Sequence, residues 1–359
     1  MTAPLATAVP HEISAGPFGK LEVTGILSGM GTTEGDHIPG DSPTHWDLSN
    51  AQVFVQKTTG WWQFYLQAGA YNLPAIGYPI ISTGDTTKEL YGPVPVAYLK
   101  LVKGSFNVEV GELPTLIGAE DTFSFENMNI ERGLLWGQET AISRGIQLNE
   151  TYKKLTLAFS WNDGFFSNRY TSLSGSLAYA FNAANTLSFV ASGNAGAYNR
   201  IVLPLSNYSP TPLYQNNSEI YNLIYTYAKG NWTVTPYYQY THVKTNPSVG
   251  ILQGSHTNGG AILANYNFKH GVSLAGRAEY IKSSGTVLDP NAINLLGYGP
   301  GSGAYSFTVT PTYVKDGFFI RGDFSIVHAT NTTPAYAVFG PNGLSVNQPR
   351  GVIEVGFMF

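Results

Sequence analysis

The sequence predicts an all-β fold, a transmembrane antiparallel up-and-down β-barrel of about 16 strands, and three observations support this prediction. Only 12% of the 359 residues are charged, whereas Gly, Tyr and Phe are abundant. Runs of roughly 9–12 residues alternate between apolar and polar side chains, as expected when one face of a strand meets lipid and the other meets water. The connections between these runs are alternately short and long, as in a barrel with short turns at one rim and long loops at the other.

The overall composition excludes several other classes of protein. No window approaches ~18 consecutive apolar residues, so a transmembrane helix is excluded. The absence of Cys argues against a disulfide scaffold and a thiolate metal site. A net charge of -4 provides no basic surface for nucleic acid. Residues 1–17 lack the basic and apolar regions of a signal peptide, so we expect a flexible N-terminal lead-in followed by one barrel domain at 18–359.

The strands are predicted from period-two alternation. Between Trp61 and Ala70, for example, Trp62, Phe64 and Leu66 share one face and polar residues occupy the other. The predicted strands are 19–29, 46–56, 61–71, 96–103, 105–113, 142–151, 153–163, 172–181, 185–195, 218–229, 231–242, 257–268, 271–282, 304–315, 317–328 and 350–359. Two prolines, Pro236 and Pro311, fall inside predicted strands, and because proline cannot donate to the ladder we expect each to mark a bulge or a strand end.

The connections predict the orientation of the barrel. The short ones, rich in Gly and Asn, which tolerate the positive φ of hairpin turns, lie at 57–60, 103–105, 152–154, 182–185, 229–231, 269–271 and 315–317. The long ones lie at about 30–45, 72–95, 114–141, 164–171, 196–217, 243–256, 283–303 and 329–349. Their strict alternation places both termini on the short-turn rim, which faces the periplasm in outer-membrane barrels.

The last ten residues predict how the barrel closes. Ile353, Val355, Phe357 and Phe359 share one parity, which suits a strand that faces lipid and ends with a ring at the headgroup level. We expect this strand to pair with the first one, placing Glu354 across from Glu22 or Lys20. A soluble propeller is the alternative, since the tight turns recur at a spacing that overlaps a blade repeat of ~40–45 residues. However, each repeating unit holds two long strands rather than four short ones, and no blade signature recurs.

A barrel of this size is a pore by default, because side chains cannot fill the interior of a 16-stranded barrel. The longest connection, 114–141, combines charged residues with apolar Phe, Leu and Trp side chains, so we expect it to fold into the lumen and constrict the channel. The alternative is a cap over the rim. The candidate constriction residues in this loop are Glu120, Asp121, Glu126, Glu131 and Arg132.

Charged residues are also predicted on the lumen side of the strands. The candidate pore-lining residues are Lys20, Glu22, Glu109, Arg277, Glu279, Arg321, Asp323 and Glu354. They could create a transverse field that orients polar solutes, or they could be cross-strand pairs that only keep the lumen wet. Their mixed sign predicts no strong preference for anions or cations. A carbohydrate-stacking ladder of Tyr65, Tyr98 and Tyr237 is a further alternative.

Catalytic and metal-binding motifs are missing from the sequence. None of the seven His residues has a ligand-type spacing, and no nucleophile elbow or phosphate loop is present. We therefore expect no enzyme activity, cofactor or metal. The rival function is a barrel enzyme, or an adhesion or structural barrel without an open pore. Ser325 and His328 form the one pair that a barrel enzyme could use, and Asp36 and Asp41 lack a fixed spacing for calcium.

A more specific pattern occurs between residues 105 and 165. The segments are Gly111-Glu-Leu-Pro-Thr-Leu-Ile-Gly-Ala-Glu120, Arg132-Gly-Leu-Leu-Trp136, Ser143-Arg-Gly-Ile-Gln147 and Trp161-Asn-Asp-Gly164. This pattern resembles the putative β-barrel porin-2 family, also called OmpL-like, although a Thr-Gly pair is more typical than Ser143-Arg144-Gly145. The resemblance implies a porin in the outer membrane of Gram-negative bacteria that passes small hydrophilic solutes by passive diffusion. The implied partners are outer-membrane lipids and lipopolysaccharide, the solutes, the outer-membrane assembly machinery through Phe359, and two further copies in a homotrimer.

Overall fold

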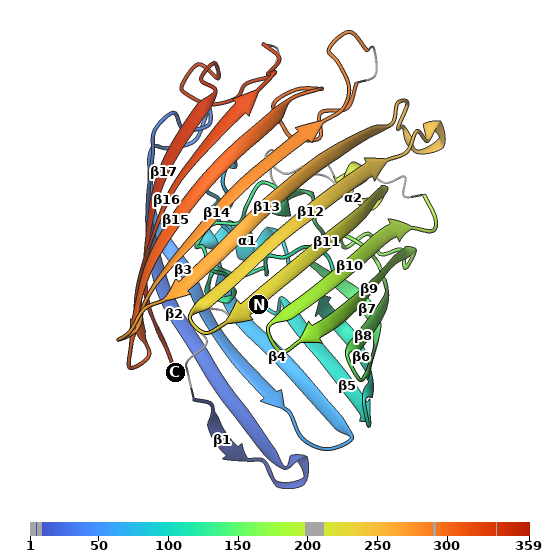
Figure 1. The fold of residues 1–359 in the computed structure, drawn as a ribbon, viewed down its shortest axis with the longest axis vertical. Helices are drawn as coiled ribbons and strands as arrows, with labels where there is room; N and C mark the ends of the chain where they lie inside the picture. The colour runs from blue at the N-terminus through green and yellow to red at the C-terminus, as the bar shows by residue number, and fades with distance from the viewer. Residues whose placement is uncertain (1–4, 6–8, 198–211, 290–291, 335) are drawn as a thin grey trace.

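The computed structural model describes residues 5, 9–197, 212–289, 292–334 and 336–359, and these form one large β-barrel (Figure 1). The strands are β1 (His11–Ser14), β2 (Lys20–Glu34), β3 (Thr44–Lys57), β4 (Trp62–Tyr71), β5 (Val96–Lys103), β6 (Phe106–Pro114), β7 (Ile142–Tyr152), β8 (Leu155–Asn162), β9 (Ser172–Asn182), β10 (Asn185–Asn194), β11 (Ser218–Lys229), β12 (Trp232–Val243), β13 (Ser255–Asn267), β14 (Val272–Ser283), β15 (Gly303–Lys315), β16 (Phe318–Thr330) and β17 (Asn347–Met358). The helical segments are η1 (Gly16–Phe18), α1 (Thr83–Glu89), η2 (Ser124–Glu126), η3 (Trp136–Gln138), α2 (Pro212–Asn216) and η4 (Pro247–Val249).

Strands β2 to β17 confirm the predicted barrel of 16 antiparallel strands. Each strand pairs with its neighbour in the chain, and β17 pairs with β2, where Phe357 lies opposite Leu27. Closure leaves no free edge along the paired length of these strands, which is required where the backbone has no water to bond. The order of short and long connections also follows the prediction.

Side chains alternate between the lumen and the outer surface along the strands. On β14, Arg277 and Glu279 are buried whereas Leu274 and Tyr280 are exposed on the outer face. The same alternation makes the outer face of β16 and β17 apolar, with Phe324 and Val355 among its exposed residues. The exposed apolar side chains therefore form the surface that meets lipid.

The helices are short. Within the described residues, none is both long enough and apolar enough to cross a membrane. Helix α1 begins at Thr83, and the preceding N-cap residue Ser82 accepts a hydrogen bond from the Asp85 N–H through its hydroxyl. It lies inside the long connection between β4 and β5.

The tight turns depend on residues that accept positive φ. At the turn between β15 and β16, Asp316 and Gly317 have φ of 49° and 85°. Two consecutive positive φ values are characteristic of the hairpin turns whose twist matches that of the flanking strands. The Asp-Gly pair at this point in the sequence is therefore a local signal for the hairpin.

The two prolines inside strands correct one expectation. Neither marks a strand end or a bulge, because the ladder has the same register on both sides of each. The pairing between β11 and β12 is interrupted next to Pro236, and the pairing between β15 and β16 is interrupted next to Pro311. On the other side of each strand the proline stays in register, with Pro236 opposite Ile262 and Pro311 opposite Leu274. A proline lacks one donor, so its effect is confined to one neighbouring strand.

The N-terminal segment differs from the expected flexible lead-in. Most of residues 1–8 lie outside the described residues, but His11–Ser14 form β1, which pairs with the start of β2. Lys20 on β2 forms an exposed ion pair with Glu12 on β1 at 2.6 Å. The first residues of β2 therefore pair with β1, on the edge of β2 where the closing strand was expected.

The register of the closing pair corrects a second expectation. Glu354 lies opposite Met30, so the predicted position of Glu354 across from Glu22 or Lys20 is wrong. The reason is that β2 continues to Glu34 and β17 pairs only with its second half, from Ile26 onward. At the other end of the seam between β17 and β2, the backbone of Phe359 exchanges two hydrogen bonds with Gly25, at 2.7 and 3.0 Å.

Candidate pore constriction

Loop 114–141 runs inside the barrel and lies against its inner wall (Figure 1). Arg321 on β16 holds the middle of the loop by its backbone. Its Nη1 donates to the Ser124 carbonyl at 2.9 Å, and its Nη2 donates to the carbonyls of Asn127 and Met128 at 3.0 and 3.1 Å. The guanidinium is completely buried by this segment. A planar group with five donors suits a loop that turns three carbonyls toward one point.

Arg277 on β14 forms a second anchor. Its Nη1 lies 2.6 Å from Glu120 Oε1 and donates to the Glu131 carbonyl at 2.7 Å. Its Nε lies 3.1 Å from Glu279 Oε2, on the same strand. All of these charged side chains are buried. Because a buried ion is costly unless it is paired, Glu120 and Arg277 depend on each other.

Arg350 on β17 forms a third anchor. Its Nη1 lies 2.6 Å from Glu131 Oε1, and its Nη2 lies 3.1 Å from Glu34 Oε2. The Glu131 backbone N–H donates to Asp323 Oδ2 at 2.8 Å. The loop is thus connected through Arg350 to the far end of β2.

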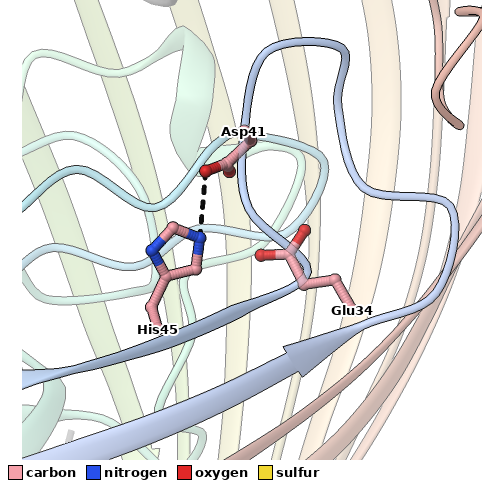
Figure 2. Close-up of side chains that lie close together, drawn as sticks. All are labelled: Glu34, Asp41 and His45. Carbon is pink, nitrogen blue, oxygen red and sulfur yellow. Dashed lines mark ion pairs between the residues drawn. The ribbon is translucent and has the colours of Figure 1, made fainter.

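A small polar cluster begins at this point and extends away from the loop. Glu34 faces Asp41 in the connection between β2 and β3 and His45 near the start of β3 (Figure 2). His45 Nε2 lies 2.9 Å from Asp41 Oδ1. This cluster shares Glu34 with the third anchor, whereas Asp41 and His45 lie beyond it.

The carboxylates of the wall complete the anchoring. Glu279 accepts from the backbone N–H groups of Leu134 and Leu135 at 3.1 and 3.4 Å. Glu354 accepts from the Ser124 hydroxyl at 3.0 Å and from Asn50 Nδ2 at 3.2 Å. Carboxylates of the wall therefore accept hydrogen bonds from the loop, and arginines of the wall donate hydrogen bonds to the loop.

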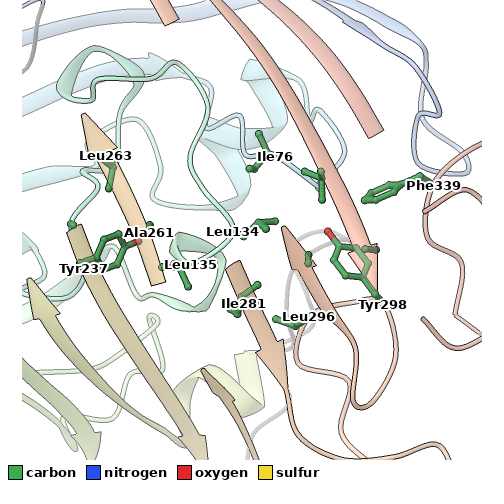
Figure 3. Packing of buried hydrophobic residues seen from close by; sticks show 14 of the residues in the cluster. Ile76, Leu134, Leu135, Tyr237, Ala261, Leu263, Ile281, Leu296, Tyr298 and Phe339 are labelled. Atoms are coloured by element: carbon green, nitrogen blue, oxygen red, sulfur yellow. The ribbon is translucent and has the colours of Figure 1, made fainter. Parts of the chain in front are cut away.

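Apolar side chains of the loop are buried against the wall (Figure 3). Leu134 and Leu135 pack into a cluster with Tyr237 on β12, Leu263 on β13 and Ile281 on β14. Burying each such side chain contributes about 1.5–3 kcal/mol relative to leaving it in water. These contacts explain why the apolar composition of the loop favours the wall over free solvent.

An open cavity of about 340 Å³ remains between the loop and the opposite strands. Tyr65 and Tyr98, on β4 and β5, border it with ring centroids 5.6 Å apart, and β11 and β12 complete the far side. The described residues that line it are Tyr65, Gln67, Val96, Tyr98, Pro114, Thr115, Leu116, Ile117, Gly118, Ala119, Glu120, Asp121, Thr122, Phe123, Glu126, Ala141, Ile224, Thr226 and Thr235. They include three carboxylates and no Lys, Arg or His.

Two of these carboxylates differ from the third in what they contact. Glu120 is paired with Arg277, whereas Asp121 is exposed and has no ion pair among the described residues. Glu126 accepts from the Phe123 backbone N–H at 3.0 Å. Burial, reinforced by the neighbouring Asp121 carboxylate, raises the pKa of Glu126 to about 8. Asp121 and Glu126 are thus the carboxylates without an ion pair at the cavity.

The other predicted site residues are not brought to this cavity. Arg132 is buried in the loop itself, where its guanidinium donates to the carbonyls of Thr122, at 2.9 Å, and Ile130. Burial lowers its pKa to about 10. Glu109 on β6 pairs with Lys100 on β5 at 2.8 Å. Glu22 accepts from Gln56 and Thr58 at the start of β2, away from the loop.

Several functional contacts were missed by sequence reasoning. Arg350 was one of them, although it has the same parity as Glu354 on the last strand and could have been assigned to the lumen by alternation. Asn222 on β11 accepts from the Gly118 N–H at 3.1 Å, and its amide donates to Gln239 at 2.8 Å. A neutral amide such as that of Asn222 carries no charge that would mark it in the sequence as a partner of the loop.

The alternative chemistries find no support in the geometry. Ser325 is buried on the inner face and donates to Glu131, whereas His328 is exposed on the outer face of the same strand. The barrel wall separates these two side chains. Tyr237 is buried in the cluster beneath the loop, so it does not continue a ladder with Tyr65 and Tyr98.

Comparison with known proteins gives one family and many similar folds. The family model described as "Putative beta-barrel porin-2, OmpL-like" matches residues 20–359. No curated protein matches the chain. Among solved structures, the anion-selective porin from Comamonas acidovorans has a TM-score of 0.64 at 12% identity, covering 94% of this chain and 99% of its own.

Two further structures are similar. The outer membrane channel DcaP of Acinetobacter baumannii has a TM-score of 0.62 at 9% identity, covering 98% of this chain and 100% of its own. The trimer form of OmpT, an outer membrane protein of Vibrio cholerae, has a TM-score of 0.59 at 9% identity, covering 94% and 99%. Identities this low establish the fold alone.

Proposed function

Because this chain belongs to the putative β-barrel porin-2, OmpL-like family, it is an outer-membrane porin, and we propose that loop 114–141 forms the constriction of its channel. The porin is not an enzyme: it forms a water-filled channel through which small hydrophilic solutes diffuse passively. The proposal is supported chiefly by the three buried arginine anchors, which hold the loop across the lumen. The open cavity beside the loop is the space left for solutes.

The constriction is selective for cations. Asp121 and Glu126 face the cavity without an ion pair, whereas the arginines of the wall lie beneath the loop. At pH 7 the negative charge comes from Asp121, and Glu126 adds its charge above its pKa of about 8. A narrow passage lined by one sign of charge attracts the opposite ion. The sequence predicted no strong preference for anions or cations because all lumen charges were taken as equally accessible. The similar fold from Comamonas acidovorans belongs to an anion-selective porin, so selectivity must depend on individual residues rather than on the barrel.

Reversal potentials in a planar bilayer with a KCl gradient at pH 9, where Glu126 is mostly ionised, test this selectivity. Wild-type protein should favour K⁺, and the double variant Asp121→Asn, Glu126→Gln should shift the reversal potential toward zero or toward anions. Asp289→Asn is the matched control, because it removes one half-buried carboxylate in another loop and should leave the reversal potential unchanged. An anion-selective wild type, or equal shifts in the control and the double variant, would overturn the assignment.

Single-channel conductance tests the constriction itself. Deletion of residues 120–135 removes most of the loop and should raise the conductance. Folding of the deletion variant is checked by its retained heat-modifiable mobility on a gel. Because the deletion also removes partners of Arg277, the substitution Glu126→Ala gives a second measurement, with a smaller increase in conductance. An unchanged conductance in both folded variants counts against the constriction.

A homotrimer is the assembly we propose for this porin. It is supported by the trimer form of one similar structure and by the exposed apolar side chains on the outer wall, which a neighbouring barrel or lipid can cover equally. Light scattering of the detergent-extracted protein should give three times the mass of the chain. Recognition of lipopolysaccharide, and of Phe359 by the assembly machinery, remain predictions.

A further inference from the structure

The end of β2 and the connection to β3 gather three potential metal ligands (Figure 2). Glu34 ends β2, Asp41 lies in the connection and His45 lies near the start of β3. One ligand atom from each residue lies within 4.8 Å of the others. We propose that these side chains bind one transition-metal dication, such as Zn²⁺, at the loop-side rim of the porin.

The first support is an unpartnered oxygen. Glu34 Oε2 is paired with Arg350 Nη2 at 3.1 Å and accepts from Gln348 Nε2 at 3.1 Å. Glu34 Oε1 is fully buried and has no hydrogen-bond partner. A buried carboxylate oxygen without a partner loses its hydration and gains nothing in return. A cation placed between Glu34 and His45 supplies the missing partner.

The second support is the balance of charge. Glu34, Asp41 and Glu131 are three carboxylates, and Arg350 is the guanidinium that pairs with two of them. With a neutral imidazole at His45, these four side chains carry a formal charge of -2. One bound dication neutralises that charge.

The type of donor selects the metal. Zn²⁺ accepts both imidazole nitrogen and carboxylate oxygen as ligands, and a water molecule can complete the tetrahedron around these three side chains. Ca²⁺ and Mg²⁺ favour sites built from oxygen alone. The His45 Nε2 atom also lies 3.0 Å from the Ser42 carbonyl. In the metal-free form this nitrogen is therefore placed to donate to Ser42 and Asp41, and metal binding replaces that proton.

The position of the site gives it a structural consequence. Glu34 lies opposite Arg350 at the loop-side end of the seam between β17 and β2. Asp41 Oδ2 accepts from the Ile80 N–H at 3.1 Å, so the connection after β4 also reaches the site. A metal ion bound here ties two loops to the strand that closes the barrel, and it stabilises the folded porin by mass action.

Calorimetric titration of Zn²⁺ into the full-length porin, refolded in detergent, tests the proposal. Wild-type protein should bind one Zn²⁺ and should bind Ca²⁺ and Mg²⁺ more weakly. His45→Gln and Asp41→Asn should each weaken Zn²⁺ binding by about tenfold or more. His242→Gln is the matched control, because His242 Nδ1 lies 3.6 Å from Glu219 Oε2 in a similar but more exposed pair. Its Zn²⁺ binding should equal that of the wild type.

Thermal unfolding gives a second measurement. Zn²⁺ should raise the melting temperature of the wild type and of His242→Gln, but not that of His45→Gln. Retained Zn²⁺ binding in folded His45→Gln, equal loss in His242→Gln, or a wild type that prefers Ca²⁺ would each overturn the proposal. If His45→Gln fails to fold, then Asp41→Asn provides the same comparison. These results are independent of channel conductance and selectivity.

Discussion

Two sides of the barrel interior differ in charge and in contact with the loop. The charged wall comprises the inner faces of β14 to β17 and the paired half of β2, where Arg277, Arg321 and Arg350 hold loop 114–141. The neutral wall comprises the inner faces of β8 to β12, and in the described part of the chain it carries Ser, Thr, Asn and Gln with apolar residues such as Ile220 and Tyr237, but no ionised side chain. Buried ion pairs connect the loop to the charged wall, whereas apolar packing of Tyr237 and hydrogen bonds of Asn222 and Gln239 connect it to the neutral wall.

The charged residues of the barrel wall are therefore largely distinct from the charged residues that border the open cavity. The arginines and carboxylates of the charged wall form ion pairs and hydrogen bonds beneath the loop, so they hold the loop in place and face little solvent. In the proposed channel, the carboxylates that solutes meet come from the loop itself. Counting charges on inward-facing strand positions therefore overestimates how many of them act on a passing ion.

The largest expected effect comes from removing an anchor of the charged wall. Arg277→Ala leaves Glu120 and Glu279 buried without their cation, which should lower the free energy of unfolding by about 3–5 kcal/mol. Urea unfolding of the refolded barrel measures this change. The matched control Arg169→Ala removes an exposed arginine in another loop and should change the free energy by less than about 0.5 kcal/mol. Equal stability of the two variants would contradict the role of the charged wall.

A smaller effect is expected where the neutral wall touches the loop. Asn222→Ala removes the acceptor of the Gly118 N–H and the donor to Gln239. Leaving these groups unpaired should lower the free energy of unfolding by about 1–3 kcal/mol, measured in the same urea experiment. A loss as large as that of Arg277→Ala would show that both walls anchor the loop equally.

A change of pH should act on the channel through Glu126. Because the pKa of Glu126 is raised to about 8, its carboxyl is neutral below that pH and ionised above it. The ionised fraction should rise from about 10% at pH 7 to about 90% at pH 9. The preference for K⁺, measured by reversal potential, should therefore increase across this range in the wild type and stay flat in Glu126→Gln. A flat wild-type profile would contradict the assignment.

The smallest effect is expected on the neutral wall away from the loop. The Ser174 hydroxyl is buried on β9 and forms no hydrogen bond. Ser174→Ala should change the free energy of unfolding by less than about 0.5 kcal/mol and leave the conductance unchanged. A loss above about 1 kcal/mol would show that the neutral wall also has a structural role.

Most of the barrel could be predicted from the sequence because alternation and turn chemistry are local. The strand from Trp62 to Tyr71 and the Asp316-Gly317 turn are examples in which neighbouring residues determine the outcome. The resemblance to the family, confirmed by the match over residues 20–359, added the function. The extent of β2 was underestimated, since the Gly-rich and Thr-rich stretch up to Glu34 has weak alternation of polarity.

The candidate site was less predictable because it depends on contacts between distant residues. The loop could be singled out by its length and its apolar side chains. The partners of its charges could not, because Glu120 meets Arg277 only through the path of the loop across the lumen. Likewise, the difference between the covered Glu120 and the open Asp121 depends on which side of the loop faces the wall.

The seam between β17 and β2 has a consequence for the order of folding. Contacts across it, such as the one between Ser28 and Glu354, join residues 326 positions apart, so they form against a large chain entropy and are expected late. Near the end of the seam the Phe359 ring covers Gly25 so closely that an added Cβ would lie 2.4 Å from it. Gly25→Ala would therefore require the Phe359 ring to shift at the final step, while leaving the hairpins intact. Until that step, the open edges of β2 and β17 expose unpaired backbone groups, and an unfinished barrel must keep them out of lipid.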